Sequence, residues 1–241
     1  MDARTPPYEL PPEGPQPLLR LPGAVTALAL LLLGIQGALY LMPARADEIL
    51  FNYGFVPVRY NAGFLAAHGI NPGSILDRVL PFFTYMFLHA GWTHVIVNTV
   101  WLAAFGAAVA RRFGTLRFYV FFVFCGLAGA ALHLLLNWTS IAPVVGASAA
   151  ISGLMAAAFR LIGREGDGFL GPQPMAPIFS RRILIWSAVW IGINIAAGLS
   201  GFGAGPGIEL IAWQAHLGGF LAGLLLSGLF DPVNRLKTTA L

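Results

Sequence analysis

The chain has 241 residues, of which 57% are hydrophobic and 10% are charged, and its mean hydropathy is +0.75. Soluble globular domains carry about 25% charged residues, so this composition excludes an ordinary soluble domain. The formal net charge of +4 does not indicate a nucleic-acid partner, because the basic residues lie in short segments between apolar runs.

The N-terminal stretch, residues 1–22, is expected to be a flexible cytoplasmic tail. It reads MDARTPPYELPPEGPQPLLRLP and is rich in proline and polar residues. It lacks the basic segment and the short apolar segment of a cleaved signal peptide. Residues 23–231 are predicted to form a single membrane domain, and residues 232–241 are predicted to form a short cytoplasmic tail.

Charge-free apolar runs long enough to cross a bilayer recur along the rest of the chain. A spanning helix needs about 17–25 residues, and in lipid a helix satisfies its own backbone hydrogen bonds. The sequence therefore predicts an all-α, polytopic membrane bundle with six spans, at residues 24–42, 93–110, 116–137, 147–163, 183–199 and 209–230. The long first loop, residues 43–92, contains prolines and apolar pieces, so it is predicted to pack on the membrane interface or dip into it.

The basic residues predict the orientation of these spans. Eleven fall on one side, namely Arg4, Arg20, Arg111, Arg112, Arg117, Arg160, Arg164, Arg181, Arg182, Arg235 and Lys237. Three fall on the other side, all in the first loop: Arg45, Arg59 and Arg78. Because loops rich in Lys and Arg stay in the cytoplasm, both termini are predicted to be cytoplasmic.

Polar residues in three of the predicted spans fall at a common depth. Ser148 is at the outer end of the fourth span, and His94 and Asn98 are in the first turns of the second. His216 is about two turns into the sixth span, so at about 1.5 Å rise per residue all of them lie within roughly the outer third of the membrane. Polar groups inside a membrane usually face the interior of the bundle, so one shared cavity is predicted.

Small residues are expected to bring the fourth and sixth spans together. His216, Gly219 and Gly223 share one helix face. The fourth span offers Gly146 and Gly153, with neighbouring alanines, as a matching smooth surface. Small side chains let helix backbones approach closely, and this helix packing would place the serine hydroxyl within hydrogen-bond reach of His216.

A serine beside a histidine suits nucleophilic catalysis. An imidazole that titrates near neutrality can take the proton of the weak nucleophile Ser148. Acyl transfer also needs hydrogen-bond donors for the developing oxyanion, and the Asn98 amide and a ring N–H of His94 are such donors. Glu209 lies seven residues before His216, about 10 Å away along a helix axis, so a dyad is expected and not a triad.

Three motifs, carried in order on the second, fourth and sixth spans, make the chain resemble the rhomboid family of intramembrane serine proteases. They are H-x-x-x-N in HVIVN (His94, Asn98), G-x-S in GAS (Ser148), and A-H-x-x-G-x-x-x-G in AHLGGFLAG (Ala215, His216, Gly219, Gly223). The resemblance covers residues 80–230 or so. It implies that Ser148 is the nucleophile and His216 the general base and then acid. It further implies an oxyanion hole made by His94, Asn98 and the Ser148 backbone N–H.

The resemblance also implies the substrates and the location. Substrates would be single transmembrane helices that enter sideways from the bilayer past the fifth span and unwind at helix-weakening residues. They would be cleaved near the outer membrane face, after a small residue. The glycine-rich stretch Gly201–Gly207 would form a flexible cap, and no cofactor is expected. The bacterial inner membrane, with the site facing the periplasm, is the expected location.

Three positions depart from the family pattern. Ala149 stands where a glycine is usual, Ser152 where an aromatic residue often stacks on the histidine, and Ala110 where a glutamate is frequent. These departures keep open an alternative function, a catalytically inactive rhomboid-like protein that binds transmembrane helices.

A metal site or transporter is the third interpretation. It would use the four histidines His89, His94, His133 and His216. No H-E-x-x-H helix pair occurs, and the membrane carboxylates of a proton pathway are missing, so a metal is not expected. The single cysteine, Cys125, lies in mid-span, where a thiol-based site is not expected.

Overall fold

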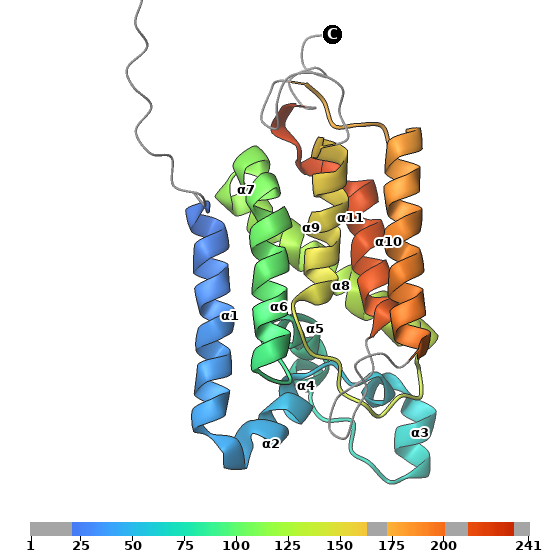
Figure 1. Cartoon of the computed structure of the whole chain (residues 1–241). Helices are drawn as coiled ribbons and strands as arrows, with labels where there is room; N and C mark the ends of the chain where they lie inside the picture. Colours follow the sequence, from blue (N-terminus) through green and yellow to red (C-terminus); the bar gives the residue numbers. More distant parts are fainter. Residues whose placement is uncertain (1–20, 163–172, 201–211, 234–241) are drawn as a thin grey trace, which may run out of the picture.

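The computed structural model describes residues 21–162, 173–200 and 212–233, and these form an all-α bundle (Figure 1). Five helical stretches in this part are long and apolar enough to cross a membrane. They are α1 (Gly23–Leu41), Trp92–Phe113, α8 (Thr115–Leu136), α10 (Arg181–Ser200) and α11 (Trp213–Phe230). The chain is therefore a polytopic membrane protein, as predicted. The two predicted tails and the predicted cap Gly201–Gly207 lie outside the described residues, apart from a few residues at the tail boundaries.

The second predicted span is a composite helix. It consists of α6 (Trp92–Trp101), a π-helical turn η3 (Leu102–Gly106) and α7 (Ala107–Phe113). A π-turn inside an α-helix changes the direction in which the following side chains point, and such turns occur often at functional sites. Gly106 fits within it because an added Cβ would lie 3.0 Å from the Leu102 side chain.

The fourth predicted span is shorter than expected. Helix α9 covers Ser148–Ile162, which is 15 residues. At about 1.5 Å per residue it is roughly 22 Å long, less than the hydrocarbon thickness of about 30 Å. The count of six spans is therefore not confirmed by length, although α9 lies inside the bundle with almost every side chain buried.

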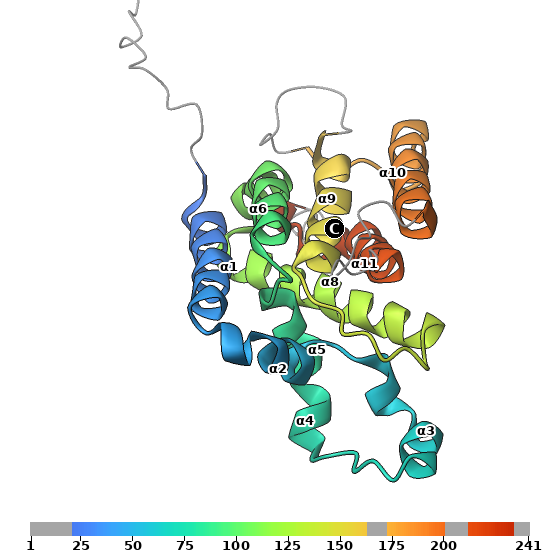
Figure 2. The same ribbon diagram turned by 60° about the horizontal axis from the view of Figure 1, so that its bottom comes forward.

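The first loop folds into short helices across one end of the bundle, which we call the loop end (Figure 2). These helices are α2 (Pro43–Tyr53), η1 (Pro57–Tyr60), α3 (Ala62–Ala67), α4 (Ile75–Val79), α5 (Pro81–Thr84) and η2 (Tyr85–Phe87). Three of them begin with proline, at a position where the missing N–H would have no partner within the helix. Ser74 and Asp77 form a capping box on α4, in which each side chain accepts a backbone N–H of the other. The loop is therefore a folded part of the protein.

Helices α8, α9 and α11 pack against one another and form the core of the bundle (Figure 1). A Cβ added to Gly219 would overlap the carbonyl oxygen of Ala149, and one added to Gly223 would overlap that of Gly153. The backbones of α9 and α11 therefore touch along this stripe, which contains Gly153, Gly219 and Gly223. Gly146 precedes α9 and lies outside the stripe, with a positive φ of 121° and an added Cβ 2.8 Å from the His94 ring.

Buried charges join the helices at the opposite end. The Arg112 guanidinium donates to both carboxylate oxygens of Asp231, at 2.8 and 3.0 Å. The two side chains are 4% and 0% exposed. Arg160 donates to the Leu224 carbonyl at 3.1 Å and to the Ser227 hydroxyl at 2.8 Å. These bonds fix the end of α11 against α7 and α9, and thereby the register of α11 along α9.

Candidate active site

The segment before Ser148 is held by the first loop. Phe55 and Val144 exchange two backbone hydrogen bonds, at 2.9 and 2.8 Å. The Gly146 N–H donates to the Tyr85 carbonyl at 2.9 Å. The chain then enters α9 at Ser148, so this serine stands at a helix N-terminus inside the protein. The first N–H groups of a helix have no partner within it and point toward negative charge.

The hydroxyl of Ser148 faces the imidazole of His216. Ser148 Oγ and His216 Nε2 are 2.7 Å apart, across 68 residues of sequence. His216 lies in the first turn of α11, at the loop end, so both groups come from helix starts that point the same way (Figure 1). Both side chains are half-buried, which leaves them within reach of water or substrate.

A third polar residue contacts the His216 imidazole on the side away from Ser148. Asn194 of α10 places its Oδ1 2.8 Å from His216 Nδ1. None of the three sequence motifs contains Asn194. The signal available was the rarity of an amide in the apolar run WIGINIAAG, the same kind of signal that singled out His94, Asn98 and Ser148.

His94 lies against the backbone next to Ser148. Its Nδ1 accepts the Ala90 N–H at 3.4 Å, so the neutral ring carries its proton on Nε2. That Nε2 is 2.8 Å from the position a Cβ would take on Gly146. The ring N–H is therefore directed toward the turn that leads into Ser148, as a donor to an oxyanion must be.

Asn98 lies one turn further along α6 and is buried at 3% exposure. One amide N–H donates to the His94 carbonyl at 2.9 Å, while Oδ1 has no hydrogen-bond partner. The second N–H of the amide remains available. A buried amide left partly unsatisfied is costly in an apolar interior, which favours a role that is completed only when another molecule binds.

The departures from the family pattern have local explanations. Ala149 is helical, and its methyl group packs against Gly129 of α8. The Ser152 hydroxyl donates to the Ser148 carbonyl at 2.8 Å, the usual bond of a serine to the preceding turn. Ala110 is buried in α7, near the ion pair of Arg112. Nothing in these contacts removes a reacting group.

The remaining predicted histidines lie around the site. The His89 Nε2 accepts the Ala147 N–H at 3.4 Å, and its ring meets that of His94 edge to face, with centroids 5.0 Å apart. The His133 Nδ1 lies 3.3 Å from the Asn137 amide nitrogen. Within residues 21–162, 173–200 and 212–233, no three His, Cys, Asp or Glu side chains gather as a metal-ligand group.

The fold and the site together define a helical membrane protein that holds a serine–histidine pair at one end of its bundle. The Rhomboid domain model matches residues 76–231, more than half of the chain, and the chain belongs to the rhomboid family. This match contains the serine–histidine pair, the two candidate oxyanion donors and Asn194. The resemblance read from the three sequence motifs is thereby confirmed.

Curated relatives agree with this assignment. RHOMBOID-like protein 1 of Arabidopsis thaliana is 31% identical over 150 residues, which cover 61% of this chain and 33% of that protein. RHOMBOID-like protein 5 of the same plant is 25% identical over 201 residues, 76% of this chain and 59% of that protein. Rhomboid protease GlpG of Salmonella paratyphi A is 25% identical over 163 residues, 67% of this chain and 52% of that protein. The chain thus matches about a third of the length of RHOMBOID-like protein 1.

Proposed function

We propose that the protein is an intramembrane serine endopeptidase that cleaves transmembrane-helix substrates near the outer membrane face. The observation that carries this proposal is the 2.7 Å contact between Ser148 Oγ and His216 Nε2. A hydroxyl becomes a useful nucleophile when a base within hydrogen-bond reach can take its proton. The name of one relative, a rhomboid protease, adds support.

The proposed reaction proceeds in two steps. His216 Nε2 takes the proton of Ser148 as the oxygen attacks the carbonyl carbon of the scissile peptide bond. The oxyanion that forms accepts hydrogen bonds from the His94 ring N–H, the free Asn98 N–H and the Ser148 backbone N–H. His216 then gives the proton to the leaving amine, and water, activated by the same imidazole, releases the acyl group from Ser148.

The distribution of basic residues supports a topology for this reaction. The described arginines of α7, α9 and the start of α10 lie at the end of the bundle opposite the loop end (Figure 1). With Lys- and Arg-rich segments in the cytoplasm, both termini are cytoplasmic and Ser148 is near the other membrane face. In a bacterial inner membrane, the location we propose, that face is periplasmic. Substrate helices would reach the site from the bilayer.

The test uses the purified full chain with a fluorophosphonate probe and a model transmembrane substrate. We expect the wild type to be labelled and to cleave, and Ser148→Ala to lose both. His216→Ala should lose about 10²–10⁴-fold in turnover while remaining folded, because the general base is gone. Ser187→Ala, which removes a serine hydroxyl from α10, is the matched control and should keep full activity. Labelling that persists in Ser148→Ala would overturn the proposal.

The same experiment separates the alternative, a catalytically inactive relative that binds transmembrane helices. Such a protein would capture the model substrate without cleaving it and would leave Ser148 unlabelled. The distinction depends on the serine itself and not on substrate affinity. A wild type that binds substrate but shows neither labelling nor turnover would therefore establish the inactive alternative.

A further inference from the structure

We propose that Asn194 is a positioning residue, which holds His216 in the ring orientation and the tautomer that let Nε2 take the proton of Ser148. This inference rests on the proposed function. It assigns to α10 a part in the chemistry, whereas the sequence motifs place the reacting groups on α6, α9 and α11 only.

The orientation of the Asn194 amide is fixed by its own helix. Asn194 Nδ2 lies 3.1 Å from the Trp190 carbonyl oxygen, and a carbonyl can only accept. The NH₂ group must therefore face Trp190, which leaves Oδ1 facing His216 at 2.8 Å. This assignment follows from the hydrogen-bond partners and needs no choice between the two amide flips.

The amide in turn fixes the tautomer of the imidazole. Oδ1 is an acceptor, so the hydrogen bond at 2.8 Å requires a proton on His216 Nδ1. A neutral imidazole carries only one ring proton, so Nε2 is bare and accepts the Ser148 hydroxyl at 2.7 Å. In the opposite tautomer two acceptors, the bare Nδ1 and Asn194 Oδ1, would face each other, and the Nε2–H would point at the Ser148 oxygen. Only the tautomer that Asn194 selects can act as the base.

This bond matters more because the aromatic support that the family often places against the histidine is replaced here. Ser152 stands where the family pattern often has an aromatic residue against the histidine, and its hydroxyl is bonded to the Ser148 carbonyl at 2.8 Å. It therefore offers His216 no stacking surface. In serine and cysteine proteases a carboxylate or an amide beyond the histidine performs the same orienting task.

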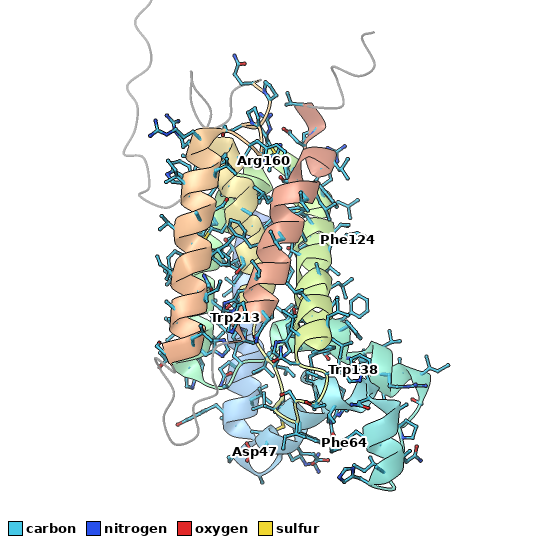
Figure 3. All side chains as sticks on the ribbon, turned by 90° about the vertical axis from the view of Figure 1, so that its right-hand side faces the viewer. Asp47, Phe64, Phe124, Trp138, Arg160 and Trp213 are labelled. Carbon is cyan, nitrogen blue, oxygen red and sulfur yellow. The ribbon has the colours of Figure 1, made fainter. Side chains whose placement is uncertain are left out.

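The position of Asn194 within α10 is unusual for a polar residue. Within α10 only Ile183 and Ser187 are buried, and the helix is the least enclosed of the five long apolar stretches. It lies beside α11, with Trp213 near the start of α11 (Figure 3). Trp190 stacks on Phe220, with ring centroids 4.4 Å apart, and Gly198 makes room for Trp213. The orientation of His216 thus depends on a helix that is otherwise largely exposed on the outside of the bundle.

If Asn194 only joined two helices and did not position His216, the expected results would differ. Amides also join helices in membranes through hydrogen bonds between neighbouring helices. Loss of such a bond would lower the melting temperature and leave the chemistry of the remaining folded protein unchanged. Loss of a positioning residue lowers kcat of the folded protein, with little change in KM.

The experiment uses the full chain in detergent micelles with Asn194→Leu, Asn194→Asp and Ser187→Ala. Asn194→Leu keeps the branched shape of the side chain and removes the acceptor, and we expect kcat to fall about 10²-fold or more, as when the wrong tautomer is favoured. Asn194→Asp restores an acceptor, so kcat should recover, with the acid limb of the pH–rate profile moved to higher pH because a carboxylate favours the protonated ring. Ser187→Ala lies two turns earlier on the same face of α10 and should match the wild type.

A second readout is independent of turnover. In ¹⁵N-histidine-labelled protein, the His216 signals, assigned by their loss in His216→Gln, should report a protonated Nδ1 in the wild type and a mixture of tautomers in Asn194→Leu. Asn194→Leu with unchanged kcat, pH profile and tautomer would overturn the inference while the proposed function stands. A wild type without labelling or cleavage would overturn the proposed function and, with it, the catalytic part of this inference.

Discussion

An ideal Cβ on Gly129 would lie 2.6 Å from the Cβ of Ala149 and 2.7 Å from the carbonyl oxygen of Ala215. Gly129 of α8 has no side chain, and the Ala149 methyl group occupies the space that a side chain there would need. This explains how the chain carries an alanine directly after the candidate nucleophile, where a glycine is usual in the family. In this chain the glycine, Gly129, lies on the neighbouring helix α8 instead.

This fit predicts an energetic coupling between the two positions. Gly129→Ala should lower the free energy of unfolding by about 1–3 kcal/mol, because overpacking forces backbones apart. In an Ala149→Gly background the same change should cost less, although the Ala215 carbonyl still opposes it. Melting in detergent measures both, with Gly34→Ala as the control, since an added Cβ there meets nothing within 4 Å. Equal losses in both backgrounds would contradict the coupling.

Asn98→Ala tests the proposed oxyanion donor. We expect kcat to fall about 10²–10³-fold and KM to change little, because the hydrogen bond strengthens as charge develops on the oxygen. Thr99→Ala is the control, because the Thr99 hydroxyl donates to the Ile96 carbonyl on the same helix, at 2.8 Å. Steady-state kinetics with the model substrate measure both constants. An effect confined to KM would assign Asn98 to substrate positioning.

The buried ion pair predicts an asymmetric mutational response. Asp231→Leu leaves the Arg112 guanidinium buried without its carboxylate, so the free energy of unfolding should fall by about 3–5 kcal/mol. The double variant Arg112→Leu/Asp231→Leu removes both charges and should be more stable than Asp231→Leu alone. Thermal unfolding in detergent checks the order. A double variant that is less stable than the single one would show that other bonds of Arg112 matter more than the pair.

The buried His89 is expected to lower the free energy of unfolding in acid. It is 1% exposed in the loop before α6, and burial, together with the nearby His94, lowers its pKa from 6.5 to about 3. Below pH 6.5 the unfolded chain binds a proton that the folded chain cannot, so this contribution to stability is present above pH 6.5 and is lost as the pH falls toward 3. The slope is at most about 1.4 kcal/mol per pH unit.

The variant His89→Gln should flatten that slope. The Gln oxygen can still accept the Ala147 N–H, which His89 Nε2 accepts at 3.4 Å, but the side chain does not titrate. Chemical unfolding at a series of pH values between 4 and 7 or so measures the slope. The exposed His68→Gln removes an imidazole elsewhere in the same loop and serves as the comparison. An unchanged slope in His89→Gln would show that the acid sensitivity arises elsewhere.

The long helices could be predicted because local sequence determines them. An uninterrupted apolar run specifies both the helix and its approximate ends, as for α1 and α8, whose predicted bounds differ from those observed by one residue. The start of α9 was also predicted to within one residue, at 147 against Ser148, but the local sequence does not show which distant segment holds the chain before it. Val144 pairs with Phe55, and this contact fixes the segment that leads into Ser148.

In the candidate site, too, only the features that depend on local sequence could be predicted. Helical spacing put His94 with Asn98, and His216 with Gly219, because a helix repeats about every 3.6 residues. Asn194 has no such relation to His216, since the two are on different helices 22 residues apart. Their contact depends on how α10 is rotated against α11, and that is decided by side-chain packing between them.

The backbone bonds ahead of Ser148 also bear on what the bilayer has to supply. Tyr85 and Phe55 belong to the first loop, so polypeptide alone sets the height and direction of the reacting hydroxyl. Protein taken out of lipid into micelles should therefore keep its reactive geometry. Membrane thickness and fluidity would then govern the arrival of a substrate helix and leave the bond-breaking step unaltered.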